Sequence, residues 1–128
     1  MFDNTKAFSS FAVNDIATAK NFYGNVLGLE VTENKMGILE LHFANGAKTI
    51  IYPKPNYVPA SFTILNFAVK DLESAMNDLI SRAVKFEIYN DEYFKTDDKG
   101  VFRGGGPLIA WFKDPAGNII SVLEDQSA

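Results

Sequence analysis

The chain contains two closely similar stretches, FAVNDIATA at Phe11–Ala19 and FAVKDLESA at Phe67–Ala75. In each stretch, aromatic and β-branched residues come before an aspartate, and apolar residues at helical spacing come after it. The aspartates Asp15 and Asp71 favour helix starts, because a carboxylate can accept the N–H groups that a first helical turn leaves unpaired. The repeat therefore predicts two copies of one strand–helix unit.

Further strands are expected after each predicted helix. Turn signals separate them, an Asn-Gly pair after the third strand of the first copy and the sequence DPAG at Asp114–Gly117 in the second. In the first copy the expected elements are strand Phe8–Val13, a helix from Ile16 to Leu27 ended by Gly28, and strands Glu30–Asn34, Ile38–Phe43 and Lys48–Tyr52. In the second copy they are a strand through Ile64–Val69, a helix from Leu72 to Ala83, and strands at Lys85–Tyr89, near Val101, at Leu108–Lys113 and at Asn118–Glu124.

This order predicts an α+β fold built from two βαβββ modules in tandem. The length of 128 residues is that of one domain. We expect module one at residues 6–53, a proline-rich linker at 54–60 and module two at 61–125. One face of each half-sheet packs against its own helix. The two half-sheets can then form a curled mixed sheet whose remaining faces enclose a cup.

Composition narrows the possible functions. The chain has no cysteine, so disulfides, thiolate metal sites and a cysteine nucleophile are excluded. A net charge of −4 argues against nucleic acid as a partner. No apolar run is long enough for a membrane span, and the N-terminus does not read as a signal peptide. We therefore expect a cytoplasmic protein with no membrane partner.

The stretches VNDIATAKNFYGNVLGL and FKDPAGNIISVLE carry a family resemblance. Together they resemble the vicinal oxygen chelate superfamily, which includes glyoxalase I, extradiol dioxygenases, and fosfomycin- and bleomycin-resistance proteins. The resemblance covers nearly the whole chain. It implies paired βαβββ modules whose sheets curl around a pocket, and it implies a homodimer.

The resemblance also implies where a metal would bind. Metal-dependent members hold one divalent ion with side chains from the first and last strands of each module. The corresponding positions here are Phe8, Ile50, Ile64 and Ser121. Phenylalanine and isoleucine offer no donor atom, and a serine hydroxyl is a weak neutral ligand. We therefore expect no metal and no other cofactor, as in bleomycin-resistance-like members, and no glyoxalase or dioxygenase activity of the usual metal-dependent kind.

Strand alternation selects the residues that would line the cup. Most are apolar with a few polar anchors, which is typical of small-molecule sites. The alternative is that the cup is filled by its own side chains and is only a core. The candidate pocket residues are Phe8, Ser10, His42, Lys48, Ile50, Tyr52, Ile64, Asn66, Phe94, Arg103, Trp111 and Ser121.

Two of these candidates have specific roles to test. His42 could be a general base oriented by Glu40, although a lone strand histidine beside a carboxylate is the plainer interpretation. Trp111, expected at the place in the second copy that matches His42, could stack on a flat ligand or lie at a sheet or dimer interface.

The stretch YNDEYFKTDDKGVFRGGGP is the longest irregular segment. Its aromatic residues and Arg103 could clamp a planar or anionic ligand, as binding loops do. The alternative is a mobile hairpin whose aromatic residues cover a sheet edge.

The leading functional hypothesis is a metal-independent small-molecule-binding protein of the glyoxalase/bleomycin-resistance type that sequesters an aromatic or cationic compound. The alternative is a glyoxalase-like lyase or isomerase, or another enzyme of the superfamily, with unconventional or no metal ligands. A third possibility is a partner-binding or regulatory domain with a closed cup.

Overall fold

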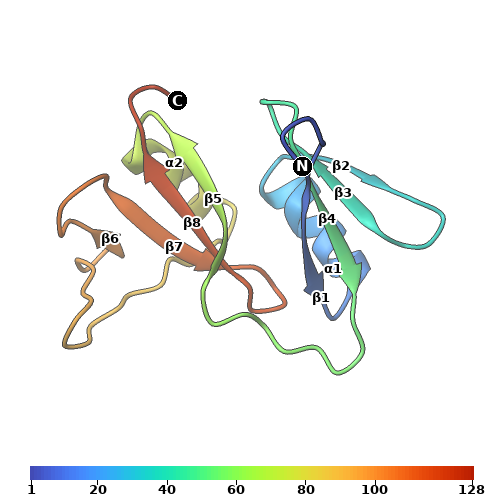
Figure 1. Ribbon diagram of the computed structural model, residues 1–128. Helices are drawn as coiled ribbons and strands as arrows, with labels where there is room; N and C mark the ends of the chain where they lie inside the picture. The colour runs from blue at the N-terminus through green and yellow to red at the C-terminus, as the bar shows by residue number, and fades with distance from the viewer. The chain divides into compact units, whose positions relative to one another are not determined.

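A computed structural model describes all residues, 1–128, and shows two compact units, Met1–Pro59 and Ala60–Ala128 (Figure 1). The boundary lies at the end of the predicted linker. Each unit is a four-stranded mixed sheet with its own helix, so the α+β class and the tandem βαβββ modules are confirmed. The units are described one at a time below.

Unit 1 has the strand order β1-β4-β3-β2, with β1 parallel to β4 and the other pairs antiparallel. Its sheet contains only strands that the sequence predicts, with some ends shifted by one residue. The elements are β1 Ser9–Val13, α1 Ile16–Asn21, the π-helix η1 Phe22–Val26, β2 Glu30–Glu33, β3 Leu39–His42 and β4 Lys48–Pro53.

The helix of unit 1 begins as predicted and changes type before it ends. Asp15 caps it, because its Oδ1 accepts the Thr18 N–H at 3.0 Å. The α-helix stops at Asn21, and a π-helix continues the chain, with the Leu27 N–H donating to the Phe22 carbonyl at 2.9 Å. Gly28 follows at φ 73°, a left-handed conformation that glycine adopts without steric cost. The expected single helix to Leu27 is thus two helical segments.

Unit 2 has the strand order β5-β8-β7-β6, with β5 parallel to β8. Asp71 caps its helix in the same way as Asp15, with its Oδ1 accepting the Ser74 N–H at 3.0 Å. The elements are β5 Thr63–Val69, α2 Leu72–Ser81, β6 Val101–Phe102, β7 Ile109–Lys113 and β8 Ile119–Glu124.

One predicted strand is wrong. The segment Lys85–Tyr89 is not a strand and makes a single bridge, Phe86 to Phe112, beside a 2.8 Å hydrogen bond from the Glu87 N–H to the Trp111 carbonyl. The outer edge of β7 explains this difference. The short strand β6 pairs with residues 109 and 110 of that edge, so only the other end of β7 remains for residues 86–87.

Each sheet buries one face under its helix. In unit 1 the strand residues that pack there include Phe11, Leu39, Leu41 and Ile51, together with the fully buried Tyr23 of η1. Their equivalents in unit 2 include Ala110, Phe112, Ile120 and Val122, packed with Leu72 and Met76 of α2. The alternation predicted for β1 is confirmed, because Phe11 and Val13 are buried and Ser10 is exposed.

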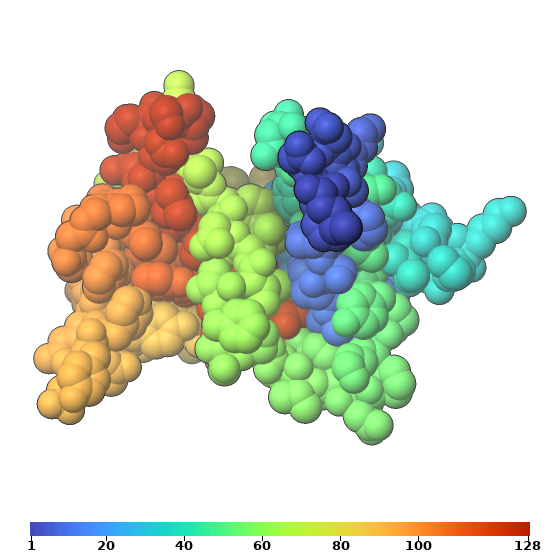
Figure 2. Space-filling view, viewed as in Figure 1, coloured from blue at the N-terminus to red at the C-terminus, as the bar shows by residue number.

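Two connecting segments project from the surface (Figure 2). One is the β2–β3 hairpin, drawn in cyan, and the other is the irregular stretch before β6, drawn in gold. Neither α-helix has the length and apolar character needed to cross a bilayer.

Candidate functional site

The face of each sheet that carries no helix, here called its helix-free face, holds most of the predicted site residues. Cross-strand pairing aligns Ser10, Ile50 and Glu40 in one row of unit 1. The same pairing aligns Asn66, Ser121 and Trp111 in one row of unit 2. The repeat makes these rows equivalent, because Phe11 pairs with Ile51 next to the first row as Phe67 pairs with Val122 next to the second.

This register corrects the expected position of Trp111. The two hairpins close in the same way, with the Phe43 N–H donating to the Ala47 carbonyl and the Asp114 N–H donating to the Asn118 carbonyl. Counting back from these bonds, Trp111 is equivalent to Glu40. The equivalent of His42 is Lys113, so the predicted match between Trp111 and His42 is wrong by two residues.

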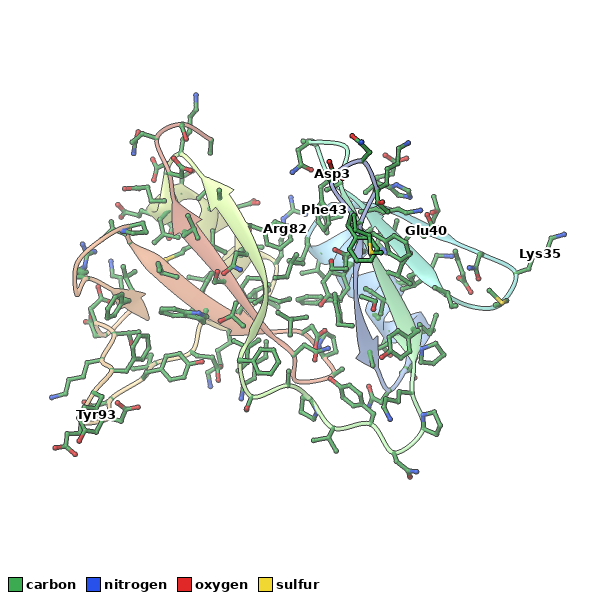
Figure 3. All side chains as sticks on the ribbon, in the orientation of Figure 1. Asp3, Lys35, Glu40, Phe43, Arg82 and Tyr93 are labelled. Carbon is green, nitrogen blue, oxygen red and sulfur yellow. The ribbon has the colours of Figure 1, made fainter.

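The helix-free face of unit 1 is polar, and two of its charged side chains, Lys48 and Glu40, are paired. Lys48 Nζ lies 3.5 Å from Glu40 Oε1 and 5.4 Å from the centroid of the Phe8 ring. His42 Nε2 lies 2.9 Å from Thr32 Oγ1. Glu40, labelled in Figure 3, therefore contacts Lys48, and the structure does not form the predicted pair in which Glu40 orients His42.

The remaining predicted residues of unit 1 lie around this cluster. Phe8 precedes β1 and is 63% exposed. Ser10 and Tyr52 are exposed, and Ile50 is half-buried. Alternation thus groups these residues on one face, but a surface of this kind gives no continuous apolar wall for a ligand.

A bulge in β5 changes which residue lies beside Trp111. Thr63 pairs with Ile119 and Leu65 pairs with Ile120, so Ile64 is the extra residue. Thr63, not Ile64, therefore shares the face of Trp111, and the indole Nε1 donates to Thr63 Oγ1 at 3.1 Å. Regular alternation predicts Ile64 there, and no turn or glycine signal in the sequence marks the bulge.

Asn66 and Ser121 form a polar pair on this face. Ser121 is 1% exposed, and its hydroxyl donates a hydrogen bond to Asn66 Oδ1. No other hydrogen bond of the Asn66 side chain is formed, so its amide NH₂ group has no acceptor within the unit.

The family resemblance places metal ligands at Phe8, Ile50, Ile64 and Ser121, and this donor set does not fit a divalent ion. Three of the four side chains are hydrocarbon, and the Ser121 hydroxyl is committed to Asn66. Within either unit, no three His, Asp or Glu side chains are grouped so as to hold a metal ion.

Four aromatic side chains gather on the helix-free face of unit 2 and form what we call the aromatic cluster: Tyr89, Phe94, Phe102 and Trp111. Phe94 and Phe102 are stacked with centroids 4.9 Å apart and planes at 17°. The Trp111 ring centroid lies 5.1 to 6.3 Å from the centroids of the other three rings, each in an edge-to-face arrangement. Tyr93, at the tip of the same segment, points away from the sheet in Figure 3 and does not belong to the cluster.

Local hydrogen bonds hold the segment that carries this cluster. The Tyr89 N–H donates to Thr96 Oγ1 at 3.0 Å, and the Asp91 carboxylate accepts the N–H groups of Tyr93 and Phe94. Burial, with a smaller contribution from the charge of Glu87, raises the pKa of the Tyr89 hydroxyl.

Arg103 lies apart from the aromatic cluster. Its Nε is 3.0 Å from Asp97 Oδ2, and it lines a cavity of about 520 Å³ beside α2, together with Leu72 and Met76. Burial would raise the pKa of Asp97, but hydrogen bonds from Val101, Arg103 and Lys99 and the charge of Arg103 lower it overall. The predicted grouping of Arg103 with the loop aromatics is therefore not formed, because alternation along β6 directs Phe102 and Arg103 to opposite faces.

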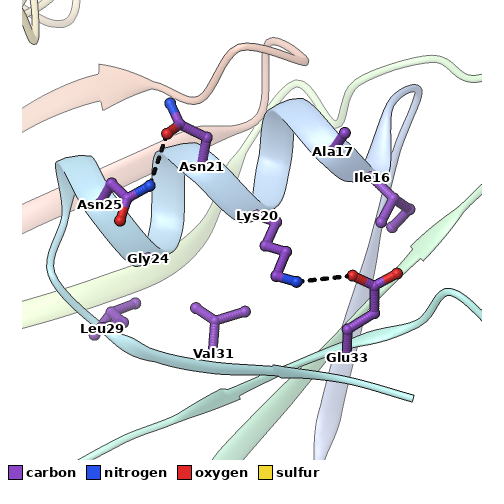
Figure 4. A pocket seen from close by; sticks show the side chains of 9 residues that line it. All are labelled: Ile16, Ala17, Lys20, Asn21, Gly24, Asn25, Leu29, Val31 and Glu33. Carbon is purple, nitrogen blue, oxygen red and sulfur yellow. Dashed lines mark hydrogen bonds and ion pairs between the residues drawn. The ribbon is translucent and has the colours of Figure 1, made fainter. Parts of the chain in front are cut away.

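A larger cavity, of about 610 Å³, lies in unit 1 between the helical segments and β2 (Figure 4). None of the predicted site residues lines it. Two internal pairs hold its polar rim, Lys20 with Glu33 at 3.1 Å and Asn25 with Asn21 at 2.8 Å. The lining is polar and apolar in similar measure, its polar side chains have partners within the unit, and we assign the cavity no ligand.

Among the site residues of unit 2, sequence analysis missed Thr63 and did not include Tyr89 and Phe102 in its candidate pocket. The aromatic content of the stretch before β6 is the signal that identifies the latter two. The role of Thr63 depends on the bulge, which no sequence signal announces.

Solved structures with the same fold cover almost the whole chain. An integron cassette protein from the mobile metagenome of V. cholerae is 25% identical, with 93% of this chain and 94% of that chain covered and a TM-score of 0.63. A superfamily member from Sphaerobacter thermophilus DSM 20745 is 19% identical, with coverage of 95% and 99% and a TM-score of 0.69. The antibiotic-binding protein TnmS3 from Streptomyces sp. CB03234 is 20% identical, with coverage of 93% and 95% and a TM-score of 0.63.

A comparison with curated proteins gives no match. The family model described as "Glyoxalase/Bleomycin resistance protein/Dioxygenase superfamily" matches residues 7–122, which extend from before β1 in unit 1 into β8 in unit 2. The chain therefore belongs to the glyoxalase/bleomycin resistance protein/dioxygenase superfamily.

Proposed function

We propose that the protein is a metal-independent small-molecule-binding protein that takes a flat aromatic compound against the aromatic cluster of unit 2. The observation that carries this proposal is the packing of Tyr89, Phe94, Phe102 and Trp111 on the helix-free face, beside the Asn66–Ser121 pair. Unit 1 presents charged side chains on its equivalent face, among them Glu40 and Lys48, so the proposal concerns unit 2.

Aromatic rings suit this role because they combine a large apolar area with a preferred geometry. Offset-stacked and edge-to-face ring pairs contribute about 0.5–1.5 kcal/mol beyond the burial of their area. The cluster rings are half-buried, so each retains accessible surface for an incoming ring. A neighbour of the same fold, TnmS3, is an antibiotic-binding protein, which supports binding as a role for this scaffold.

Metal independence follows from the donor chemistry. The positions at which the family resemblance implies ligands hold two isoleucines, a phenylalanine and a serine whose hydroxyl already donates to Asn66. A divalent ion gains too little from such a set to leave water. Neither Glu40 nor His42 supplies a free site, since each has a side-chain partner in unit 1.

The experiment uses Trp111, the single tryptophan of the chain. EDTA-treated protein is titrated with 9-fluorenone, a neutral flat probe, and with proflavine, a cationic one, and tryptophan emission is followed. We expect saturable quenching by 9-fluorenone. The matched variants are Trp111→Ala and Glu40→Ala, which alter equivalent positions of the two units, and their binding is followed by ligand-observed NMR.

We expect Trp111→Ala to weaken binding of the probe about tenfold and Glu40→Ala to change it less than twofold, since one stacking contact is worth about 1 kcal/mol or more. Equal loss in both variants would contradict a site in unit 2. A rise in melting temperature with Ni²⁺, Zn²⁺, Mn²⁺ or Fe²⁺ that EDTA reverses would contradict metal independence. The homodimer implied by the resemblance belongs to the same proposal and is checked by light scattering after gel filtration.

A further inference from the structure

We infer that Asn66 is the polar anchor of the unit 2 site, and that the bound compound is a planar, uncharged molecule presenting a carbonyl-type oxygen to the Asn66 side-chain amide. This inference rests on the proposed function and adds the chemistry of the ligand to it. The evidence for it is which polar groups on the helix-free face of unit 2 already have hydrogen-bond partners and which do not.

The Asn66 side chain has a protein partner for its carbonyl oxygen and none for its NH₂ group. Its Oδ1 accepts the hydroxyl hydrogen of the nearly fully buried Ser121, which sets the orientation of the amide plane. The residue is exposed and its NH₂ group has no acceptor within the unit, so both N–H donors are open to a ligand. An amide held in this way is preorganised, so a ligand acceptor does not have to order it first.

The neighbouring donors are already engaged. The Trp111 indole N–H donates to Thr63, and the Ser121 hydroxyl donates to Asn66. Trp111 pairs directly with Ser121 across β7 and β8, and Ser121 pairs with Asn66 across β8 and β5. A ring stacked on the exposed part of Trp111 therefore has the Asn66 amide two strands away on the same face.

Charge on this face also limits the ligand. The only ionised strand residue there is Lys113, and its Nζ lies 3.5 Å from Glu87 Oε1. The other strand residues of the face, Ala68, Ile109, Ile119 and Leu123, are apolar. An ionic ligand would lose hydration without gaining a counter-charge, whereas a neutral carbonyl oxygen needs only one donor.

Unit 1 provides a natural control. The equivalents of Asn66 and Ser121 are Ser10 and Ile50, which pair across β1 and β4. Ile50 has no hydroxyl, so the unit 1 row contains no fixed amide and no buried hydroxyl that could orient one. The anchor is thus a property of unit 2 alone.

The test compares 9-fluorenone with fluorene, which have the same flat carbon frame and differ in the carbonyl oxygen. Dissociation constants are measured for the unmodified protein, for Asn66→Leu, for the double variant Asn66→Leu/Ser121→Ala and for the control Ser10→Ala. The double variant removes both partners of the hydrogen bond, so it leaves no buried hydroxyl unpaired and keeps the fold testable.

We expect the unmodified protein and Ser10→Ala to bind 9-fluorenone about tenfold more tightly than fluorene, the effect of one good hydrogen bond. Both Asn66 variants should lose this preference and keep their affinity for fluorene. In ¹H–¹⁵N spectra, the Asn66 side-chain NH₂ signals should shift with 9-fluorenone and stay in place with fluorene.

The outcomes separate this inference from the proposed function. If neither compound binds, the aromatic site itself is refuted. If both bind with equal affinity, or if the Asn66 variants weaken both equally, the aromatic site stands and the carbonyl anchor is overturned. If the preference is present but the Asn66 NH₂ signals do not move, another donor is the anchor and the inference is likewise overturned.

Discussion

Leu41 in unit 1 and Phe112 in unit 2 occupy equivalent positions, and both are fully buried under a helix. Glu40 and Trp111, one residue earlier in each strand, are equally matched in position but differ in chemistry. Glu40 pairs with Lys48, whereas Trp111 packs into the aromatic cluster. The comparison teaches that the repeat fixes the face beneath each helix, while the helix-free face is free to diverge.

The divergence has a structural cause at the edge of each sheet. In unit 1 only residues 27–29 connect the helical segments to the edge strand β2. In unit 2 a long segment, residues 82–100, runs from α2 to the equivalent edge strand β6 and brings Tyr89 and Phe94 onto the sheet beside Phe102 of β6. The longer connection of unit 2 supplies aromatic rings, and the corresponding connection of unit 1 is too short to supply any.

The strongest test of the shared part of this comparison is truncation beneath the helices. Leu41→Ala and Phe112→Ala each remove a side chain with no exposed surface. We expect losses of about 2–5 kcal/mol for Leu41→Ala and about 3–5 kcal/mol for Phe112→Ala, from lost burial and the cavity left behind. Denaturant unfolding measures both, and a loss below about 1 kcal/mol in either variant would contradict the equivalence.

The next largest expected effect is a difference in stability loss between a glycine substitution in unit 1 and one in unit 2. Gly46 and Gly100 both adopt positive φ, at 83° and 96°. A Cβ at Gly46 would meet nothing within 4 Å, whereas one at Gly100 would lie 2.8 Å from the Glu87 carbonyl oxygen. We expect Gly46→Ala to cost about 1–2 kcal/mol from backbone strain and Gly100→Ala to cost more.

The change at Gly100 should also reach the site. The Glu87 N–H donates to the Trp111 carbonyl, so a displaced Glu87 disturbs the strand that carries the indole. Tryptophan emission should therefore shift in Gly100→Ala and not in Gly46→Ala. Equal unfolding free energies and unchanged emission in both variants would argue that residues 86–87 do not support β7.

The helix caps give a smaller contrast. Asp15 and Asp71 each accept one N–H at 3.0 Å, but α2 has a second acceptor, because Glu124 Oε1 accepts the Leu72 N–H at 3.0 Å. We expect Asp15→Ala to cost about 1 kcal/mol and Asp71→Ala about half as much, since Glu124 still serves the start of α2. Urea unfolding of the two variants, with Glu124→Gln/Asp71→Ala as the combined control, checks the order. A larger loss for Asp71→Ala would contradict it.

The smallest expected effect is the pH dependence of the segment before β6. The hydrogen bonds of Asp97 lower its pKa in the folded protein, so its contribution to stability is full above the unfolded value of about 3.9. It is lost as pH falls through the lowered folded value. We expect tryptophan emission to change below about pH 4, as the links to Val101 and Arg103 break.

Asp97→Asn is the control for this titration. The amide keeps an acceptor for the N–H groups of Lys99 and Val101 but does not ionise, so the emission change attributed to Asp97 should disappear. An identical acid profile in Asp97→Asn would assign the change to another group.

Local chemistry determines much of this protein from its sequence. The aspartates before each helix, the Asn-Gly and DPAG turns and the alternation along β1 each act over a few residues, and the structure confirms them. The family motifs likewise lie in contiguous stretches, so the α+β class and the two modules were predictable. The side chains at the expected metal positions were also readable, because a residue's donor atoms do not depend on the fold.

Tertiary structure alone decided which residues meet on each face. The bulge at Ile64 puts Thr63 beside Trp111. The bulge arises from the pairing of β5 with β8, which the alternation of residues along one strand does not predict. Phe102 joins the aromatic cluster and Arg103 leaves it because β6 pairs with β7 in a particular register. The Asn66–Ser121 bond joins residues far apart in the chain. Strand register, which depends on long-range backbone hydrogen bonds, therefore completed the site that short-range patterns had only outlined.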